Sequence, residues 1–199
     1  DLRTERLDLL KKEGGSIANS ISELGKASDV VFVMVMTGKQ VSGIILGDNG
    51  LLKSMRPGSV IILSSTIAPS DAREVAVPVL KGAIQMIDTP VSGGKSGAEN
   101  GTLTMMAAST KETFDEYQDV LKGVGEKIIH VGEEIGMGQT VKAALQALMG
   151  DVTVLPGRDI TPATISDADI LLVRSITPVN ESLLAGSCLL YTSDAADEG

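Results

Sequence analysis

The sequence predicts an α/β fold built on a doubly wound parallel sheet. Two continuous apolar runs, residues 29–36 and 60–63, are typical of parallel strands buried on both faces, and helical patterns alternate with them. The composition agrees, because 43% of the 199 residues are hydrophobic, 22 are glycines and only 2% are aromatic, as in an aliphatic α/β core. In such a sheet, ligands bind at the carboxyl ends of the strands.

The first part of the chain alternates helical and extended patterns up to residue 79. Leu7 and Leu10 share one face of an opening helix that Gly14 ends, and Pro69 begins a later one. The expected elements, in order, are helices over residues 3–13 and 20–27, a strand over 29–36, helical pieces over 41–46 and 51–55, a strand over 60–63 and a helix over 69–79.

The second part continues this alternation. We expect a strand over residues 103–107, a helix over 110–121 and a strand over 126–131. The last strand contains His130, the single histidine of the chain. Because nothing in the sequence pairs with it, we interpret His130 as a strand-surface residue without a catalytic role.

A loop rich in glycine and serine lies between Pro90, where an apolar run stops, and the strand expected over residues 103–107. Such a loop brings bare backbone N–H groups and hydroxyls close to a small ligand. The stretch Gly94-Lys95-Ser96 is not a phosphate-binding loop, because Thr89 stands where that motif needs a glycine and no helix pattern follows. On the residues alone, an ordinary connection between two strands remains open.

The composition bears on several classes of function. A formal charge of −9, with scattered Lys and Arg, argues against a nucleic-acid surface, and no apolar run reaches the ~20 residues that cross a bilayer. One cysteine excludes a disulfide framework and favours a cytoplasmic setting. With one histidine beside it, no metal site is predicted.

A helix is expected from residue 139 to 148. Gln139, Lys142 and Gln146 share one polar stripe, and Val141 and Leu145 belong to the apolar stripe. On the residues alone, a lysine between two amides is usual on a solvated helix face.

Two motifs carry a resemblance. Residues 88–94 read Asp-Thr-Pro-Val-Ser-Gly-Gly, and Gly97-Ala98 and residues 101–104, Gly-Thr-Leu-Thr, follow. This resembles the substrate-binding signature of the β-hydroxyacid dehydrogenases, which include 3-hydroxyisobutyrate dehydrogenase, tartronate semialdehyde reductase and L-threonate dehydrogenase. The pattern Gly136-x-Gly138-x-x-x-Lys142, with an amide at Gln146, resembles the catalytic helix of that family. The resemblance covers residues 1–148 and implies a truncated Rossmann-like domain and NAD(P)-dependent interconversion of an alcohol and a carbonyl.

The resemblance also implies roles on the substrate side. Lys142 would be catalytic, stabilising charge on the substrate oxygen and transferring its proton. Ser92, Gly93 and Gly94 would hold the carboxylate of a small hydroxycarboxylate substrate. Gln146 would orient the substrate hydroxyls or Lys142. Many family members carry Asn at that position, and Gln there points to the threonate-type branch.

On the cofactor side, Asp1 would bind the adenosine ribose, which favours NAD, with NADP as the alternative. Thr66 would lie beside the nicotinamide ring. On the residues alone, Asp1 is a solvated terminal residue and Thr66 is equally a strand-end or helix-capping hydroxyl. In the family, an all-helical domain carries much of the dimer contact, so the resemblance also implies a homo-oligomer.

We predict four segments. Residues 1–133 form a partial NAD(P)-binding domain, and residues 134–149 begin the interdomain helix. Residues 150–187 resemble the amino-terminal region of 4-phosphoerythronate dehydrogenase, in which Arg174-Ser175 matches a substrate-contacting strand end. Residues 188–199 resemble a translated sequencing adapter and are left out of fold reasoning.

The segment after residue 149 is expected to pack poorly, with at most a strand over residues 170–173 and a helix over 180–184. We expect a chimeric chain that is inactive as it stands, because neither a phosphate-binding glycine turn nor the helical domain is found in it. The alternative is a non-catalytic α/β fragment that at most binds a small carboxylate.

Overall fold

The computed structural model describes residues 3–147, 161–162, 170–171 and 190–191. The chain divides into two compact units between Met149 and Gly150. Within the described residues, no helix is long and apolar enough to cross a membrane.

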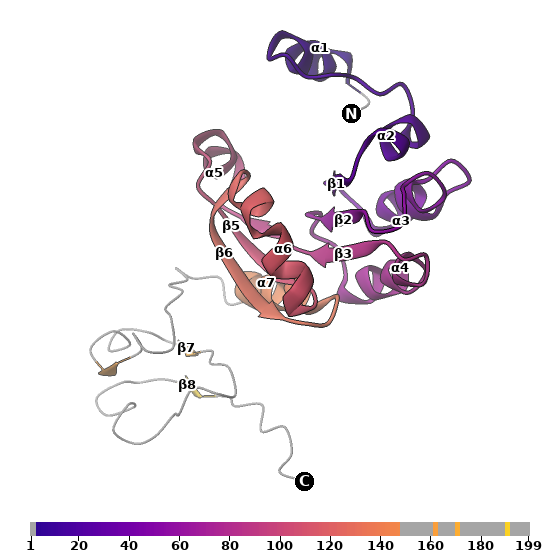
Figure 1. Ribbon diagram of the computed structural model, residues 1–199. Helices are drawn as coiled ribbons and strands as arrows, with labels where there is room; N and C mark the ends of the chain where they lie inside the picture. The colour runs from indigo at the N-terminus through magenta and orange to yellow at the C-terminus, as the bar shows by residue number, and fades with distance from the viewer. Residues whose placement is uncertain (1–2, 148–160, 163–169, 172–189, 192–199) are drawn as a thin grey trace. The chain divides into compact units, whose positions relative to one another are not determined.

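The first unit is built on a six-stranded sheet (Figure 1). Its strands are β1 (Val30–Val33), β2 (Val60–Leu63), β3 (Gln85–Asp88), β4 (Val91–Ser92), β5 (Leu103–Ala108) and β6 (Gly125–Gly132). Strands β1, β2 and β3 pair in parallel, as do β5 and β6. The doubly wound α/β class and the pairing of the two apolar runs are therefore confirmed.

The expectation of a wholly parallel sheet is wrong, because β5 runs antiparallel to both β3 and β4. A parallel connection needs a crossover that passes over one face of the sheet. After β3 the chain continues in the same direction through β4 and reverses in the segment that holds a short helix, residues 94–100, so β5 returns antiparallel to both strands.

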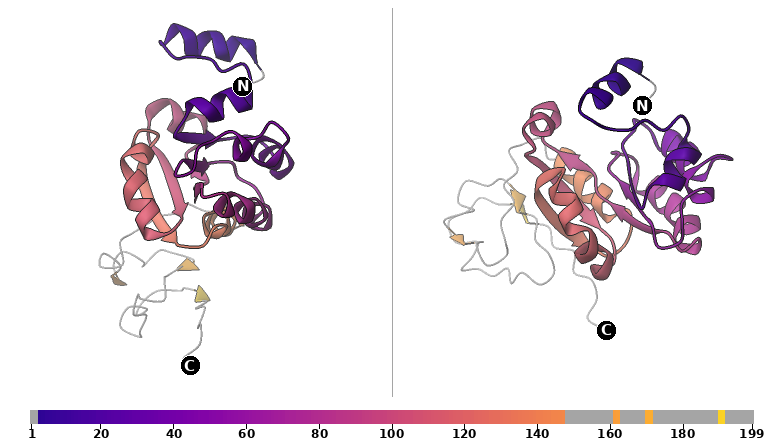
Figure 2. Two further views of the ribbon diagram at one scale, coloured as in Figure 1. Left: turned by 45° about the vertical axis from the view of Figure 1, so that its right-hand side comes forward. Right: turned by 45° about the horizontal axis from the view of Figure 1, so that its top comes forward.

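Helices lie on both faces of this sheet, although α1, near the N-terminus, stands away from it and has no buried residue (Figures 1 and 2). The helices of the first unit are α1 (Thr4–Lys12), α2 (Ile21–Ala27), α3 (Gly38–Leu46), α4 (Pro69–Lys81), α5 (Gly94–Asn100), α6 (Lys111–Lys122) and α7 (Met137–Ala147), with a 3-10 turn, η1 (Leu51–Lys53). The side chains of Ser20, Thr37 and Thr110 accept a hydrogen bond from the first turn of α2, α3 and α6 respectively. Capping hydroxyls of this kind fix where a helix starts. The predicted starts of α2 and α6 are confirmed to within one residue, whereas α3 begins three residues before the predicted 41–46.

Two apolar clusters form the core, one on each face. The first joins β1, β2 and β3 to α3 and α4, and Val41, Ile45, Ile61, Leu63 and Val79 lie fully buried in it. The second joins the opposite face to α6 through buried Phe114 and Leu121. All four residues of β2 are buried, because this strand lies inside the sheet and is covered on both sides.

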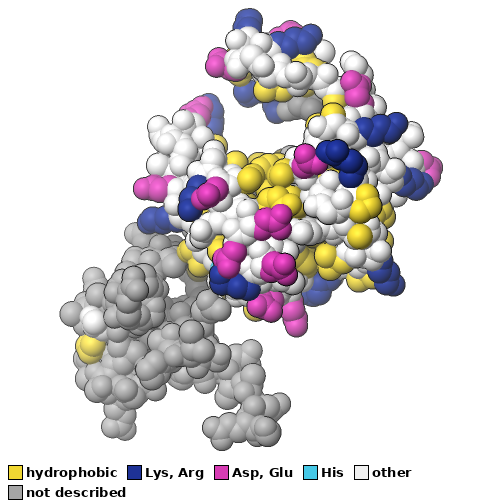
Figure 3. All heavy atoms as spheres, viewed as in Figure 1, with side chains coloured by type: hydrophobic (Ala, Val, Ile, Leu, Met, Phe, Trp, Pro, Cys, Tyr) yellow, Lys and Arg dark blue, Asp and Glu magenta, His cyan; other side chains and the backbone are white. Residues whose placement is uncertain are grey.

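Strand β1 corrects the prediction of a strand over residues 29–36 that is buried on both faces. It ends at Val33, and the side chains of Phe32, Met34 and Met36 are 37%, 64% and 84% exposed. β1 is the last strand on its side of the sheet. Apolar side chains also reach the surface elsewhere on the first unit, and Figure 3 shows a group of them on the viewed face.

In the second unit, β7 (Ile170–Leu171) pairs in parallel with β8 (Leu190–Tyr191). The predicted strand is thus confirmed at its first two residues. β8 lies within residues 188–199, whose resemblance to a translated sequencing adapter stays a prediction. The helix predicted over 180–184 and Arg174-Ser175 lie outside the described residues, and the four-segment division stays a prediction.

Candidate active site

The predicted substrate loop is more regular than its sequence indicates. Ser92 belongs to β4 and pairs with Thr104 of β5, and residues 94–100 form α5 instead of an irregular connection. Local contacts support this helix, since Asn100 Nδ2 donates to the Ser96 carbonyl at 2.9 Å and Lys95 pairs with Glu99. Glycine-rich composition therefore concealed a helix that short-range side-chain bonds stabilise.

Gly93 has a backbone conformation that requires glycine. Its φ of +123° is one that other residues rarely adopt, and a Cβ there would lie 3.2 Å from Leu103 Cδ2. Gly93 and Gly94 are exposed and Ser92 is partly buried, so the start of the loop is open to a ligand.

Helix α7 begins against the ends of β3 and β5. A Cβ on Gly138 would lie 2.4 Å from the carbonyl oxygen of Met106 and 2.9 Å from that of Asp88 and from Pro90 Cδ. This close approach to backbone is the physical reason for glycine at the second position of the Gly-x-Gly motif.

Asp88 is a buried carboxyl group that caps α7 from another element. It is 0% exposed, and its Oδ2 accepts hydrogen bonds from Gly136 N at 2.9 Å and Gln139 N at 3.2 Å. Its Oδ1 accepts a bond from Gln139 Nε2 at 2.7 Å. Desolvation raises the pKa of Asp88, and the hydrogen bonds from Gln139 and Gly136 oppose that rise.

Gln139 corrects the predicted polar stripe, because this side chain is only 1% exposed. Its Nε2 donates to the Ser65 carbonyl at 2.9 Å, and its Oε1 accepts from Ile67 N at 2.9 Å. These two residues flank Thr66, whose side chain is exposed after β2. One buried amide therefore connects the segment around Thr66 to the first turn of α7.

The position of Lys142 follows from helix geometry. Successive residues turn by about 100°, so Lys142 lies about 40° around the helix from Gly138, toward Gln139. It is one turn further along α7, on the side between the ends of β2 and β3, and it is partly buried. Gln146 is two turns along on the same side and is exposed.

The structure connects some of the predicted site residues but not all of them. Thr66 is held to α7 through its neighbours, and Pro90, two residues before Ser92, meets α7 at Gly138. Within the described part of the chain, no hydrogen bond joins Lys142 to Ser92 or Gln146. Asp1 lies outside the described residues.

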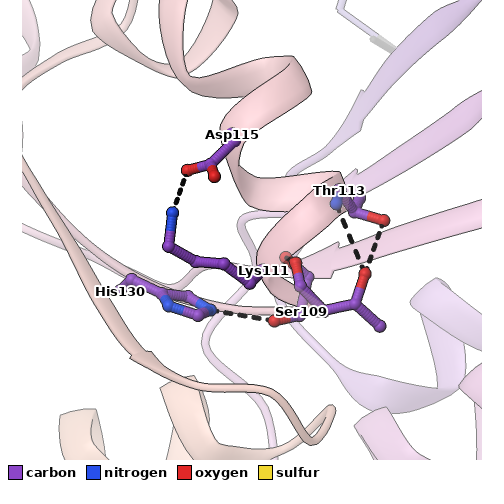
Figure 4. Close-up of polar contacts among 6 residues, drawn as sticks. Ser109, Lys111, Thr113, Asp115 and His130 are labelled. Carbon is purple, nitrogen blue, oxygen red and sulfur yellow. Dashed lines mark hydrogen bonds and ion pairs between the residues drawn. The ribbon is translucent and has the colours of Figure 1, made fainter.

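His130 has partners, so the prediction of an unpaired strand-surface residue is wrong (Figure 4). It is partly buried, its Nε2 lies 2.8 Å from the Ser109 carbonyl oxygen, and its ring stacks on Phe114 at 4.5 Å between centroids. On the same helix as Phe114, Lys111 pairs with Asp115. The two contacts of His130 hold β6 against the start of α6.

Two features of the site escaped sequence reasoning, namely the roles of Asp88 and Gln139. Both belong to the recognised motifs, Asp88 as the first residue of one and Gln139 directly after Gly138 in the other, and this membership was the available signal. In addition, among the described residues no group of three or more His, Cys, Asp or Glu side chains could hold a metal ion.

The family comparison matches the NAD binding domain of 6-phosphogluconate dehydrogenase to residues 1–132. The chain belongs to this NAD-binding family. A probable mitochondrial 3-hydroxyisobutyrate dehydrogenase of Dictyostelium discoideum is 38% identical over 150 residues, covering 75% of this chain and 46% of the relative. L-threonate dehydrogenase of Escherichia coli K12 is 34% identical over 151 residues, covering 75% and 50%.

Solved structures agree with this membership of the NAD-binding family. The crystal structure of 3-hydroxyisobutyrate dehydrogenase from Salmonella typhimurium matches with a TM-score of 0.69 and 32% identity, over 74% of this chain and 52% of that one. The resemblance to the β-hydroxyacid dehydrogenases is confirmed. The chain spans about half the length of the curated relatives it matches.

Proposed function

We propose that this chain carries the reaction centre of an NAD(P)-dependent oxidoreductase that interconverts the hydroxyl and carbonyl forms of a small 3-hydroxy acid. The observation that supports it best is the attachment of α7 to two strand ends. Gln139 bonds on both sides of Thr66, and Gly138 meets Asp88 and Pro90 at backbone distance. Lys142 follows one turn later on the side between these contacts, where a substrate held by the loop after Pro90 would meet it.

The carboxyl edge of β1 and β2 fits a nicotinamide dinucleotide. Met34 and Met36 offer exposed apolar surface after β1, and Thr66 offers an exposed hydroxyl after β2. Ser64 Oγ, at the same edge, is buried with no hydrogen-bond partner among the described residues. Met34, Met36 and Thr66 would contact the cofactor, NAD or alternatively NADP, which when bound would supply the hydride acceptor or donor.

The residues of the chain would contribute binding and proton transfer. The Lys142 ammonium would stabilise negative charge on the substrate oxygen and exchange a proton with it. Ser92 and the N–H groups of Gly93 and Gly94 would bind the substrate carboxylate. Gln146, exposed further along α7, would orient the substrate hydroxyls or Lys142 itself.

The test uses a hybrid in which this chain's matching residues replace the corresponding 151 residues of the Escherichia coli relative. NADH oxidation is measured with a panel of short semialdehydes. We expect turnover in the hybrid and a loss of at least ~100-fold for Lys142→Ala, as for removal of a general acid–base group. Lys122→Ala, on the exposed surface of α6, is the matched control and should keep its rate. Equal rates for Lys142→Ala and the unsubstituted hybrid would exclude Lys142 as the catalytic residue.

The alternative, a non-catalytic fragment that binds a small carboxylate, predicts a different result. Addition of a 3-hydroxy acid would shift the amide resonances of Ser92, Gly93 and Gly94, and the hybrid would show no turnover.

The incomplete and chimeric origin expected for the chain also stays a proposal, and a single genomic read across residues 130–199 would test it. A cytoplasmic setting and a homo-oligomeric parent likewise stay predictions.

A further inference from the structure

Asp88 and Gln139 form a buried polar cluster to which the proposed chemistry assigns no role. We call their shared hydrogen bonds the Asp88–Gln139 clamp. It consists of five bonds. Asp88 Oδ2 accepts from the backbone N–H groups of Gly136 and Gln139. Gln139 Nε2 donates to Asp88 Oδ1 and to the Ser65 carbonyl, and Gln139 Oε1 accepts from the Ile67 N–H.

The clamp joins three segments that are far apart in the sequence. Its bonds span 48 to 74 residues and connect the ends of β2 and β3 to the first turn of α7. Both side chains are at most 1% exposed, so neither contacts solvent.

The donors and acceptors in the clamp allow one arrangement. Asp88 only accepts hydrogen bonds, and every group that faces it is an N–H donor. If the Gln139 amide turned over, its oxygen would face Asp88 Oδ1 and its NH2 would face the Ile67 N–H. Because an unpaired buried polar group costs much more than a hydrogen bond contributes, alternative arrangements are excluded.

We propose that the Asp88–Gln139 clamp is a positioning element that sets the location of Lys142 relative to Thr66. Its relevance to catalysis rests on the proposed function, in which Lys142 contacts the substrate and Thr66 contacts the cofactor. The clamp fixes the first turn of α7, and Lys142 is one turn later. A shift at the clamp is therefore carried directly to the lysine.

The test measures this position in the 199-residue chain, without turnover. A spin label is attached at Thr66→Cys in a Cys188→Ser background, and broadening of the Lys142 amide resonance reports its distance from the label. Amide exchange at Gly136 and Gln139 reports the bonds to Asp88.

Asp88→Asn is the first variant. Its side-chain oxygen can still accept from Gly136 and Gln139, but its NH2 group faces Gln139 Nε2, a second donor. Because a neutral acceptor replaces a charged one, we expect exchange at the two amides to be about 10-fold faster. We also expect the broadening at Lys142 to fall.

A reciprocal exchange tests the specificity of this effect. Gln139→Glu alone sets two carboxyl groups against each other. In the double variant Asp88→Asn/Gln139→Glu, the Asn NH2 donates to the Glu carboxylate, so four of the five bonds can re-form. The double variant should regain broadening at Lys142 relative to both single variants.

Two further variants complete the design. Thr113→Val removes a buried hydroxyl bond at the start of α6 and is the control for general destabilisation. Gln139→Met keeps both backbone bonds to Asp88 and removes the links to β2. It should lower the broadening at Lys142 and gives the same test if Asp88→Asn does not fold.

The proposal is overturned if the clamp variants are destabilised like Thr113→Val but keep full broadening at Lys142, or if the double variant is no better than the single ones. These outcomes are independent of the proposed function. If Lys142→Ala keeps full turnover in the hybrid, the catalytic assignment fails and the positional result still stands.

Discussion

Gly138→Ala adds a single methyl group where α7 meets the backbone of two strands. The new Cβ would lie 2.4 Å from the carbonyl oxygen of Met106 and 2.9 Å from that of Asp88. Neither atom belongs to a flexible side chain, so the clash can be relieved only if α7 moves. The substitution therefore tests whether the Gly-x-Gly motif exists for close packing.

Two opposing effects set the magnitude. Alanine favours a helix interior over glycine by up to ~1 kcal/mol. Overpacking of a well-filled site costs about 1–3 kcal/mol. Because the contact is with backbone, we expect the second effect to dominate and Gly138→Ala to lower the free energy of unfolding by roughly 1–2 kcal/mol.

Gly43→Ala is the matched control. Gly43 also lies within a helix, α3, but a Cβ there would meet nothing within 4 Å. This substitution should stabilise the first unit by about 0.5–1 kcal/mol. The two variants should thus differ by about 2 kcal/mol, or about 4–8 °C in melting temperature for a chain of this size.

Urea and thermal unfolding, followed by far-ultraviolet circular dichroism, measure both changes. In the hybrid, Gly138→Ala should also lower kcat, because the shift of α7 displaces Lys142, and a displacement of ~1 Å can cost on the order of 100-fold. If Gly138→Ala stabilised the protein as much as Gly43→Ala does, the close-approach explanation of the motif would be refuted.

Three other predictions follow from single contacts. Burial raises the pKa of Asp88 above 3.8, so the folded protein retains the proton to a higher pH than the unfolded chain. The difference in free energy of unfolding between this protein and Asp88→Asn should therefore fall as pH rises from about 4 through the raised pKa, and it should stay level outside that range. Urea unfolding measured at a series of pH values would show this. Phe114→Ala should lower the free energy of unfolding by about 3–5 kcal/mol, because Phe114 is 5% exposed and its ring stacks on His130. Val120, on the same helix, is 38% exposed, so Val120→Ala should lower it little. In the hybrid, Ser92→Ala should raise KM for the 3-hydroxy acid roughly 10-fold, and no change relative to Ser96→Ala on α5 would contradict the carboxylate assignment.

Much of the fold was predictable because its signals are local. The apolar run of β2 and the capping hydroxyls of Ser20 and Thr110 act within a few residues, so the sequence shows them directly. The direction of β5 was not predictable in this way. It depends on the reversal of the chain through α5, after β4, and a strand has the same local pattern in either direction.

The exposed edge at β1 shows a second limit. The apolar pattern of residues 29–36 is the pattern of a doubly covered strand, yet Met34 and Met36 are exposed. Hydrophobicity records that a side chain suits an apolar contact. It does not say whether that contact is with the core of the same unit or with a ligand at the carboxyl edge of the sheet. In the proposed function, Met34 and Met36 contact a ligand, the cofactor.

The candidate site was predictable only as far as its motifs reach. Lys142, Ser92 and Gly93 belong to sequence motifs, so they could be identified without a structure. Gln139 was instead placed on a solvated stripe, because helical periodicity groups it with Lys142. Periodicity shows which residues share a side of a helix but not where along that side the protein surface begins. In the first turn of α7, the side that faces Asp88 is buried at Gly138 and Gln139, whereas Met137 and Thr140 on the other side are exposed. Further along the polar stripe, Lys142 is partly buried and Gln146 is exposed. The same stripe can therefore hold a buried amide that fixes the helix and, one turn later, a lysine that is free to meet a substrate. If this division is correct, Gln139→Met should lower kcat in the hybrid with little change in KM, whereas Gln146→Met should act mainly on KM.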